Sequence, residues 1–198
     1  MKESVINELD TYSLSDFMPM EADVYLRLFV RLNELVWPGQ FVTLGMGLLI
    51  LWMLVRNRVR VAGLLLGVAW FSSGYFFHLH FFAELNWVAV YFGWAFIFQG
   101  LLLVFYGVIG WLKTRPAREW TVLNRLGALL MAVALVGYPL LMPITGRGWK
   151  AMEVFALAPD PTTLFTFGFL LINVGLNRTL WIIPIAWSLL SGATWYAL

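Results

Sequence analysis

The 198-residue chain contains no cysteine and few charged residues. The lack of cysteine excludes disulfides, thiolate metal sites, covalent haem attachment and cysteine nucleophiles. Asp, Glu, Lys and Arg make up only 12% of the residues, whereas 61% are hydrophobic, and the mean hydropathy is +0.79. Soluble globular domains carry about 25% charged residues. We therefore expect most of this chain to be surrounded by lipid.

The few charged residues are also distributed unevenly, because six stretches of the sequence contain none. A helix needs about 20 apolar residues to cross roughly 30 Å of hydrocarbon, and all but the fifth stretch satisfy that length. Helices pair every backbone N–H and C=O group inside lipid, so each stretch is predicted to be a transmembrane helix. The charge-free stretches are 35–55, 61–83, 85–112, 126–146, 161–177 and 179–198.

These features predict an all-α, polytopic membrane protein, a six-transmembrane-helix bundle with an N-terminal interfacial amphipathic helix. Residues 1–21 form an acidic, polar N-terminal tail. Residues 22–36 place Val24, Leu28 and Leu32 near one helical face, which is typical of an amphipathic helix in the membrane interface. The six-helix membrane domain covers 37–198, and its spans are expected near 38–55, 61–82, 87–112, 123–143, 161–176 and 180–197.

Basic residues are concentrated in alternate loops. Loops rich in Lys and Arg remain in the cytoplasm, and the loops after the first, third and fifth spans carry most of them. Both termini are therefore predicted to be periplasmic or extracellular, with the chain in a bacterial inner (plasma) membrane. The basic residues of these loops are Arg56, Arg58, Arg60, Lys113, Arg115, Arg118, Arg125 and Arg178, against Arg147 and Lys150 in the opposite loops.

Three stretches resemble a known family. Residues 33–40 (NELVWPGQ), 74–86 (GYFFHLHFFAELN) and 155–168 (FALAPDPTTLFTFG) are similar to a bacterial family of six-span membrane proteins catalogued as a domain of unknown function. The resemblance implies the six-span fold and singles out His78, but it implies no reaction. The chain departs from the family pattern at Asp160, where the family has a cysteine between two prolines. A role that depends on that thiol would not apply here.

Ionisable and strongly polar side chains near or within a span are candidate functional residues, because an unpaired polar group in lipid is costly. His78 and His80 lie near the outer end of the second span, and Glu84 and Asn86 follow in a short outer loop. His80 and Glu84 are four residues apart and would share a helix face, whereas His78 would point away from it.

These residues leave two interpretations open. A metal site would use His78, His80 and Glu84 together with a carboxylate from another outer segment. Alternatively, the histidines transfer protons, or they lie at the interface and bond to a carbonyl or hydroxyl group. The sequence itself requires no cofactor. The carboxylates that could complete a metal site are Glu34, Glu153 and Asp160.

The fifth predicted span is interrupted by prolines. Its apolar run from 164 to 172 is short, and Pro-Asp-Pro at 159–161 separates it from an upstream apolar run. A short, proline-interrupted segment is typical of a broken helix whose N-terminus lines a cavity. We expect Asp160 to cap a helix that begins at the second proline, with the hydroxyls of Thr162 and Thr163 beside it. An ordinary outer loop before a capped helix would produce the same pattern.

The third predicted span carries one amide and a row of glycines. Gln99 lies at its middle and could meet Ser72 and Ser73 of the second span, either as a packing bond or as part of a pore lining. The glycines share one face, which favours close helix contacts within the chain, or with a second copy or a partner membrane subunit. They are Gly93, Gly100 and Gly107.

The leading functional hypothesis is a small-solute or ion transport or permeation protein, with an outward-facing polar cavity formed by the second, third and fifth spans. One alternative is a structural or accessory subunit that binds a partner membrane complex. Another is an intramembrane metal-binding protein or metalloenzyme. The candidate cavity residues are His78, His80, Glu84, Asn86, Gln99, Asp160, Thr162 and Thr163.

Motifs of several other classes are missing from the sequence. It contains no glycine-rich phosphate loop, no G-x-S-x-G and no HExxH, so we predict no catalytic residues. Its pI near 9.0 comes from the arginines that set topology. The expected partner is therefore the lipid bilayer, and nucleic acid is not expected.

Overall fold

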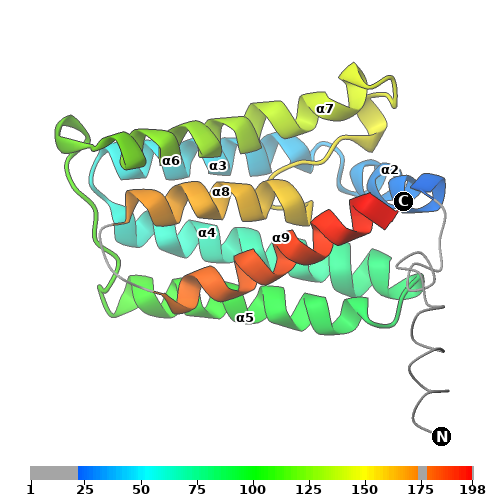
Figure 1. Ribbon diagram of the computed structural model, residues 1–198, viewed down its shortest axis with the longest axis horizontal. Helices are drawn as coiled ribbons and strands as arrows, with labels where there is room; N and C mark the ends of the chain where they lie inside the picture. Colours follow the sequence, from blue (N-terminus) through cyan, green and yellow to red (C-terminus); the bar gives the residue numbers. More distant parts are fainter. Residues whose placement is uncertain (1–21, 174–177, 198) are drawn as a thin grey trace, which may run out of the picture.

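The computed structural model describes residues 22–173 and 178–197, and every regular element in these two ranges is a helix. This confirms the all-α prediction for the described residues. Successive long helices run side by side in alternating directions (Figure 1). The tail predicted at 1–21 and the last residues of the fifth predicted span, 174–176, lie outside the described part of the chain.

The elements follow the charge-free stretches closely. Segments η2 and η5 are π-helical, and η3, η4 and η6 are single 3₁₀ turns. In chain order the elements are α2 (Ala22–Val36), α3 (Gly39–Val55), α4 (Val59–Ser73), η2 (Gly74–Phe81), η3 (Phe82–Glu84), α5 (Ala89–Val108), η4 (Ala117–Glu119), α6 (Val122–Ala132), η5 (Val133–Gly137), α7 (Tyr138–Ile144), η6 (Trp149–Ala151), α8 (Pro159–Ile172) and α9 (Thr179–Ala197).

Three continuous helical stretches among the described residues are long and apolar enough to cross a membrane. They are Val59–Glu84, Ala89–Val108 and Val122–Ile144. Helices α2 and α3 meet at an angle of 92° and would provide a fourth if the bent pair is one span. Helix α8 has only 14 residues, so its length, about 21 Å at 1.5 Å per residue, is less than the hydrocarbon thickness.

The core of the bundle lies where α4 and α8 pass each other. Trp70 of α4 is fully buried, and its indole N–H donates to the Thr166 hydroxyl of α8 at 2.7 Å. Thr166 in turn donates to the carbonyl of Thr162, one helical turn earlier, at 2.8 Å. A buried indole needs such an acceptor. The bond therefore fixes the register of α8 against α4 and, with it, the position of the α8 N-terminus.

Glycines allow the closest helix contacts. A Cβ added at Gly168 in α8 would meet the carbonyl oxygen of Gly127 in α6, so these two backbones touch with no side chain between them. The glycines predicted to form one face of the third span lie in α5 and contact α4 and η2. That face is therefore covered within the chain, and it leaves no exposed glycine surface for a partner. These glycines are Gly93, Gly100 and Gly107.

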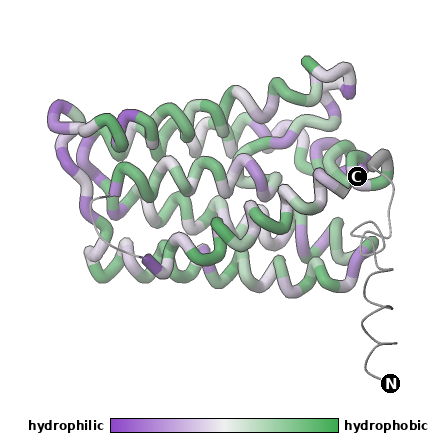
Figure 2. Tube along the Cα trace, in the orientation of Figure 1, coloured by the Kyte–Doolittle hydropathy of each residue, from purple (hydrophilic) through white to green (hydrophobic). Residues whose placement is uncertain are grey.

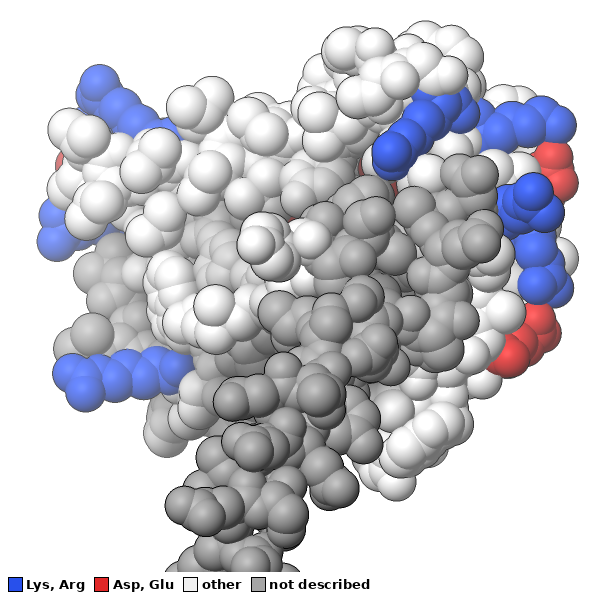
Figure 3. Space-filling model, turned by 45° about the vertical axis from the view of Figure 1, so that its right-hand side comes forward, with Lys and Arg blue, Asp and Glu red and all other residues white. Residues whose placement is uncertain are grey.

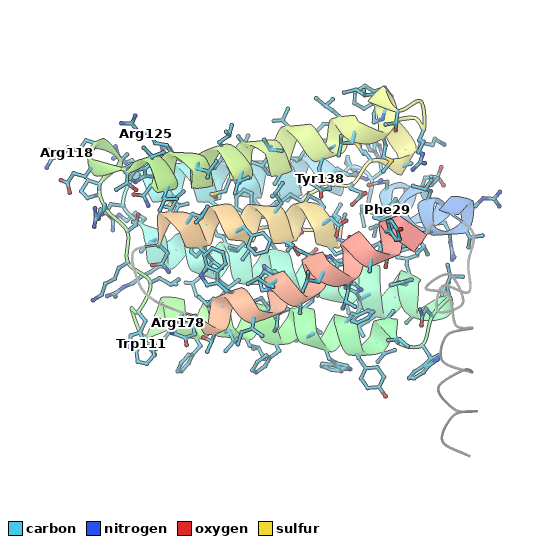
Figure 4. The ribbon with its side chains drawn as sticks, viewed as in Figure 1. Phe29, Trp111, Arg118, Arg125, Tyr138 and Arg178 are labelled. Carbon is cyan, nitrogen blue, oxygen red and sulfur yellow. The ribbon has the colours of Figure 1, made fainter. Side chains whose placement is uncertain are left out.

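The outside of the bundle is largely apolar along its length. Figure 2 shows hydrophilic segments mainly in the loops at both ends of the bundle. On the face of the molecule drawn in Figure 3, the Lys, Arg, Asp and Glu side chains lie mainly at the two ends of the bundle. Arg118, Arg125 and Arg178 lie at one end of the molecule (Figure 4). We call this the basic end. Helix α2, η3 and η6 lie at the opposite end, where α9 also finishes (Figure 1).

Candidate functional site

Helix α8 begins at the opposite end with two prolines in its first turn. Pro159 is its first residue and Ala158 precedes it as the N-cap, without a side-chain cap. Prolines are tolerated there because the N–H groups of a first turn have no partner within the helix. The prediction that Asp160 caps a helix beginning at Pro161 is wrong. Because the helix starts two residues earlier, Asp160 lies inside its first turn and is free to point toward α9.

The threonine that follows has a structural role. Thr162 is fully buried, donates to the Ala158 carbonyl at 2.7 Å and accepts from the backbone N–H of Ala156 at 2.9 Å. Ala156 has a positive φ of 66°, which is unusual for a residue with a Cβ. The Thr162 hydroxyl therefore holds the 152–158 segment in a tight turn over the start of α8. The structure uses Thr162 as a support rather than as a free hydroxyl.

Asp160 is held by two donors from α9. The indole N–H of Trp187 donates to one carboxylate oxygen and the Ser191 hydroxyl donates to the other, each at 2.7 Å. Trp187 and Ser191 are four residues apart and lie on one face of α9, which runs obliquely past the beginning of α8 (Figure 1). Two short bonds to separate oxygens fix the position of this carboxyl group against α9.

A cavity of about 330 Å³ opens beside Asp160, between α7, α8, α9 and the 152–158 segment. We call it the acid cavity. Its other acidic residue is Glu153, whose side chain is only 3% exposed. No Lys or Arg is among the described residues that line it. The lining residues are Tyr138, Leu141, Met142, Glu153, Asp160, Thr163, Leu164, Phe167, Ser188, Ser191 and Gly192.

Two polar atoms of the acid cavity have no partner among the described residues. They are one carboxyl oxygen of Glu153, Oε2, and the hydroxyl of Thr163, which is 2% exposed. Burial raises the pKa of Glu153 well above its ordinary value, and the negative charge of Asp160 raises it further. Glu153 therefore retains its proton at pH values where an exposed glutamate is ionised.

The position of the cavity along the bundle can be followed in Figure 4. Tyr138, which lines it from α7, lies away from the end that carries Arg118 and Arg125. The acid cavity is therefore in the half of the molecule opposite the basic end.

One family matches residues 22–198, nearly the whole chain. The chain belongs to DUF6064, a family of unknown function. No curated protein and no solved structure matches it. The expected resemblance to a domain of unknown function is confirmed at this level.

His78 of this DUF6064 protein lies outside the acid cavity. Its side chain is fully buried in η2, and neither ring nitrogen has a partner among the described residues. The imidazole is enclosed by aromatic rings, with centroid distances of 4.5 Å to Phe96 and 4.8 Å to Trp187. Because Trp187 also holds Asp160, this indole separates the imidazole from the acid cavity.

The other predicted residues of this region are dispersed. His80 is exposed and stacks on Tyr75 with a centroid distance of 6.5 Å. Glu84 forms an ion pair with Arg31 of α2 at 3.1 Å. Asn86 accepts from the backbone N–H of Val88 at 2.9 Å and stabilises the turn before α5. These residues connect α2 and the η3 turn and do not line a common cavity.

The predicted metal site and the predicted Gln99 contact are both absent from the part of the chain that the structure describes. No three His, Asp or Glu residues there could hold one ion, because His78 is enclosed, His80 is exposed and Glu84 is paired. Gln99 donates from Nε2 to the carbonyl of Leu180 in α9 at 3.0 Å. It therefore ties α5 to α9. Of the eight predicted cavity residues, Asp160 and Thr163 line the acid cavity.

Sequence reasoning missed most of the acid cavity. Glu153 was considered only as a possible metal ligand, and Tyr138, Trp187 and Ser191 were not singled out. One signal was available for Glu153, since it directly precedes the apolar run 154–158. The hydroxyls of α7 and α9 carry no such signal, because serine and tyrosine are common in apolar helices.

Proposed function

We propose that this DUF6064 protein is a multi-pass membrane protein that transports a small solute, or lets it pass, by way of the acid cavity. The observation that carries the proposal is the buried, unpartnered Glu153 oxygen and Thr163 hydroxyl of two residues that line that cavity. Leaving a buried polar group without a partner costs about 1 to 3 kcal/mol. A bound solute that forms these missing hydrogen bonds would offset the cost.

The membrane placement is supported by the distribution of charge and apolar surface. The proposed six spans are α3, α4 with η2 and η3, α5, α6 with η5 and α7, α8, and α9. With these spans, the loops at the basic end face the cytoplasm. The large apolar side chains exposed along the helices, such as Val122 (83% exposed) and Leu189 (71%), would then contact lipid. The acid cavity would open toward the periplasm or cell exterior of a bacterial inner membrane.

Helices α2 and α8 fit this placement in different ways. Helix α2 turns by 92° from α3 and would lie in the outer interface. Helix α8 is too short to cross alone, but the buried run 154–158 continues it toward the opposite end. Such a broken span, with an irregular segment lining a cavity, is a common solute-site geometry in transporters. The glycines of α5 are covered by α4 and η2, so they give no comparable support for an accessory subunit.

Transport can be tested with the full chain reconstituted in liposomes. Osmotic swelling would be recorded with a neutral solute (glycerol), an anion (acetate) and organic cations (methylammonium and benzylammonium). We expect at least one of these to enter faster than into empty liposomes, and Asp160→Asn to reduce that rate at least tenfold. The matched control is Glu119→Gln, which changes an exposed acid at the basic end. Equal rates in protein-containing and empty liposomes for every solute would refute transport.

A further inference from the structure

The charges around the acid cavity define what its occupant must supply. Glu153 and Asp160 are both acidic, and the groups near them from the other elements are neutral. They are the Trp187 indole and the Ser191 hydroxyl of α9, which donate to Asp160, Tyr138 of α7 in the cavity wall, and Tyr25 of α2. The nearest described cation of the same loop, Lys150, bonds to Glu34 at 2.8 Å and is exposed. The site therefore has an uncompensated negative charge.

The buried atoms left without a partner can accept hydrogen bonds once Glu153 is deprotonated. Asp160 already accepts from Trp187 and Ser191, whereas Glu153 Oε2 and the Thr163 hydroxyl have no partner among the described residues. An ammonium group carries three N–H donors and no acceptor. It would match a deprotonated Glu153, Asp160 and Thr163 with one N–H for each. An anion would add negative charge beside two acidic residues.

The size and the walls of the cavity favour an ammonium with an apolar body. A volume of about 330 Å³ is far larger than a single water-sized ion requires, about 30 Å³. Its apolar lining residues are Leu141, Met142, Leu164 and Phe167, and Tyr138 adds an aromatic ring. Aromatic rings attract cations, and aliphatic side chains favour burial of a hydrocarbon body.

We infer that the solute is an organic ammonium ion and that its binding releases the proton of Glu153. The inference rests on the proposed function, since it takes the acid cavity to be the solute site. Before binding, the buried Glu153 is neutral. Binding brings in one positive charge, the Glu153 O–H bond breaks heterolytically, and the proton leaves to water. The two carboxylates then share the ammonium, and no covalent bond to the solute forms. Because the ammonium ion brings in one positive charge as the proton leaves, the net charge of the cavity and its contents stays unchanged.

Calorimetry on the purified full chain tests both the ammonium assignment and the release of the Glu153 proton. Benzylammonium would be titrated in phosphate and in Tris at one pH, because the two buffers differ in ionisation heat and so report the protons released. We expect release approaching one proton per ligand. The association constant should rise about tenfold per pH unit while Glu153 is protonated. In Glu153→Gln we expect no proton release and no pH dependence, and in Thr163→Val at least a threefold loss of affinity. Melting curves would confirm that both variants are folded.

The neutral and anionic analogues supply the controls. Benzyl alcohol and benzoate should bind at least tenfold more weakly than benzylammonium, and Glu119→Gln should behave like the unaltered chain. The inference is overturned if the neutral analogue binds as well, if no analogue binds, or if Glu153→Gln releases as many protons. Proton-linked binding without flux would refute transport alone. Swelling with glycerol but without benzylammonium binding would refute the ammonium assignment alone.

Discussion

At the scale of single residues, the burial of Glu153 makes the stability of the folded chain depend on pH. Its pKa is raised in the folded state by burial and by Asp160, so the folded chain binds a proton that the unfolded chain loses above about pH 4.3. The stability is therefore complete at low pH and declines as pH rises toward the raised pKa, by up to about 1.4 kcal/mol per pH unit. We predict a falling melting temperature between pH 5 and pH 8.

The matched variants for this prediction differ in burial alone. Glu153→Gln keeps the shape and should flatten the pH dependence, whereas Glu119→Gln, at an exposed position, should retain the slope. Differential scanning fluorimetry of the detergent-solubilised chain measures all three. Parallel slopes in the unaltered chain and Glu153→Gln would show that another group is responsible.

Replacing the buried His78 is predicted to increase the stability of the folded chain. Its two ring nitrogens are buried without partners among the described residues, in a box of aromatic rings. Replacing it with leucine, which has a similar volume and no polar atom, should increase the free energy of unfolding by about 1 kcal/mol. Trp187→Phe is the contrasting variant, because it removes the donor to Asp160 and should lower stability. Denaturant titration followed by tryptophan fluorescence would measure His78→Leu. A loss of stability would mean that the imidazole has a partner in solution.

At the scale of elements, the contact between α6 and α8 depends on two glycines. A Cβ at Gly168 would meet the backbone carbonyl of Gly127 and the backbone nitrogen of Met131, and backbone atoms cannot move aside as a side-chain end can. Gly168→Ala should therefore destabilise the chain by about 1 to 3 kcal/mol. Gly45→Ala in α3 is the control, since nothing lies within 4 Å of its added Cβ. We expect it to be neutral or stabilising by about 0.5 to 1 kcal/mol. Equal melting temperatures in the two variants would contradict the packing.

The positions of the helices could be predicted from the sequence because most charge-free stretches have the length of a helix of about 20 residues. Helices α2 and α9 match their predicted ranges within one residue. The directions of side chains in η2 could not be predicted. A π-helix bonds residues five apart, so the four-residue spacing of His80 and Glu84 no longer describes a shared face. The helix also changes from π-helical η2 to the 3₁₀ turn η3 between these two residues.

The candidate site was only partly predictable for a related reason. The prolines at 159–161 identified Asp160 and Thr163, because proline has a local effect that sequence reveals. The partners of Asp160 are 27 and 31 residues away, in α9. Which helix crosses α8, and with which face, is decided by packing such as the Trp70 to Thr166 bond. No local pattern records that choice. The sequence predicts a polar cavity between the second, third and fifth spans, whereas the acid cavity lies between α7, α8 and α9.

At the scale of the whole molecule, the proposed six spans alternate between the basic end and the opposite end, and the weakest is α8. The cysteine-free sequence allows single cysteines to be labelled without background. In intact cells, a membrane-impermeant maleimide should label Leu85→Cys and Thr145→Cys. Asn57→Cys, Glu119→Cys and Thr179→Cys should react only after permeabilisation. Labelling of Thr179→Cys from outside would mean that α8 enters and leaves on the same side. The acid cavity would then lie at the tip of a re-entrant segment, and α9 would have to begin outside, against the direction that Arg178 favours.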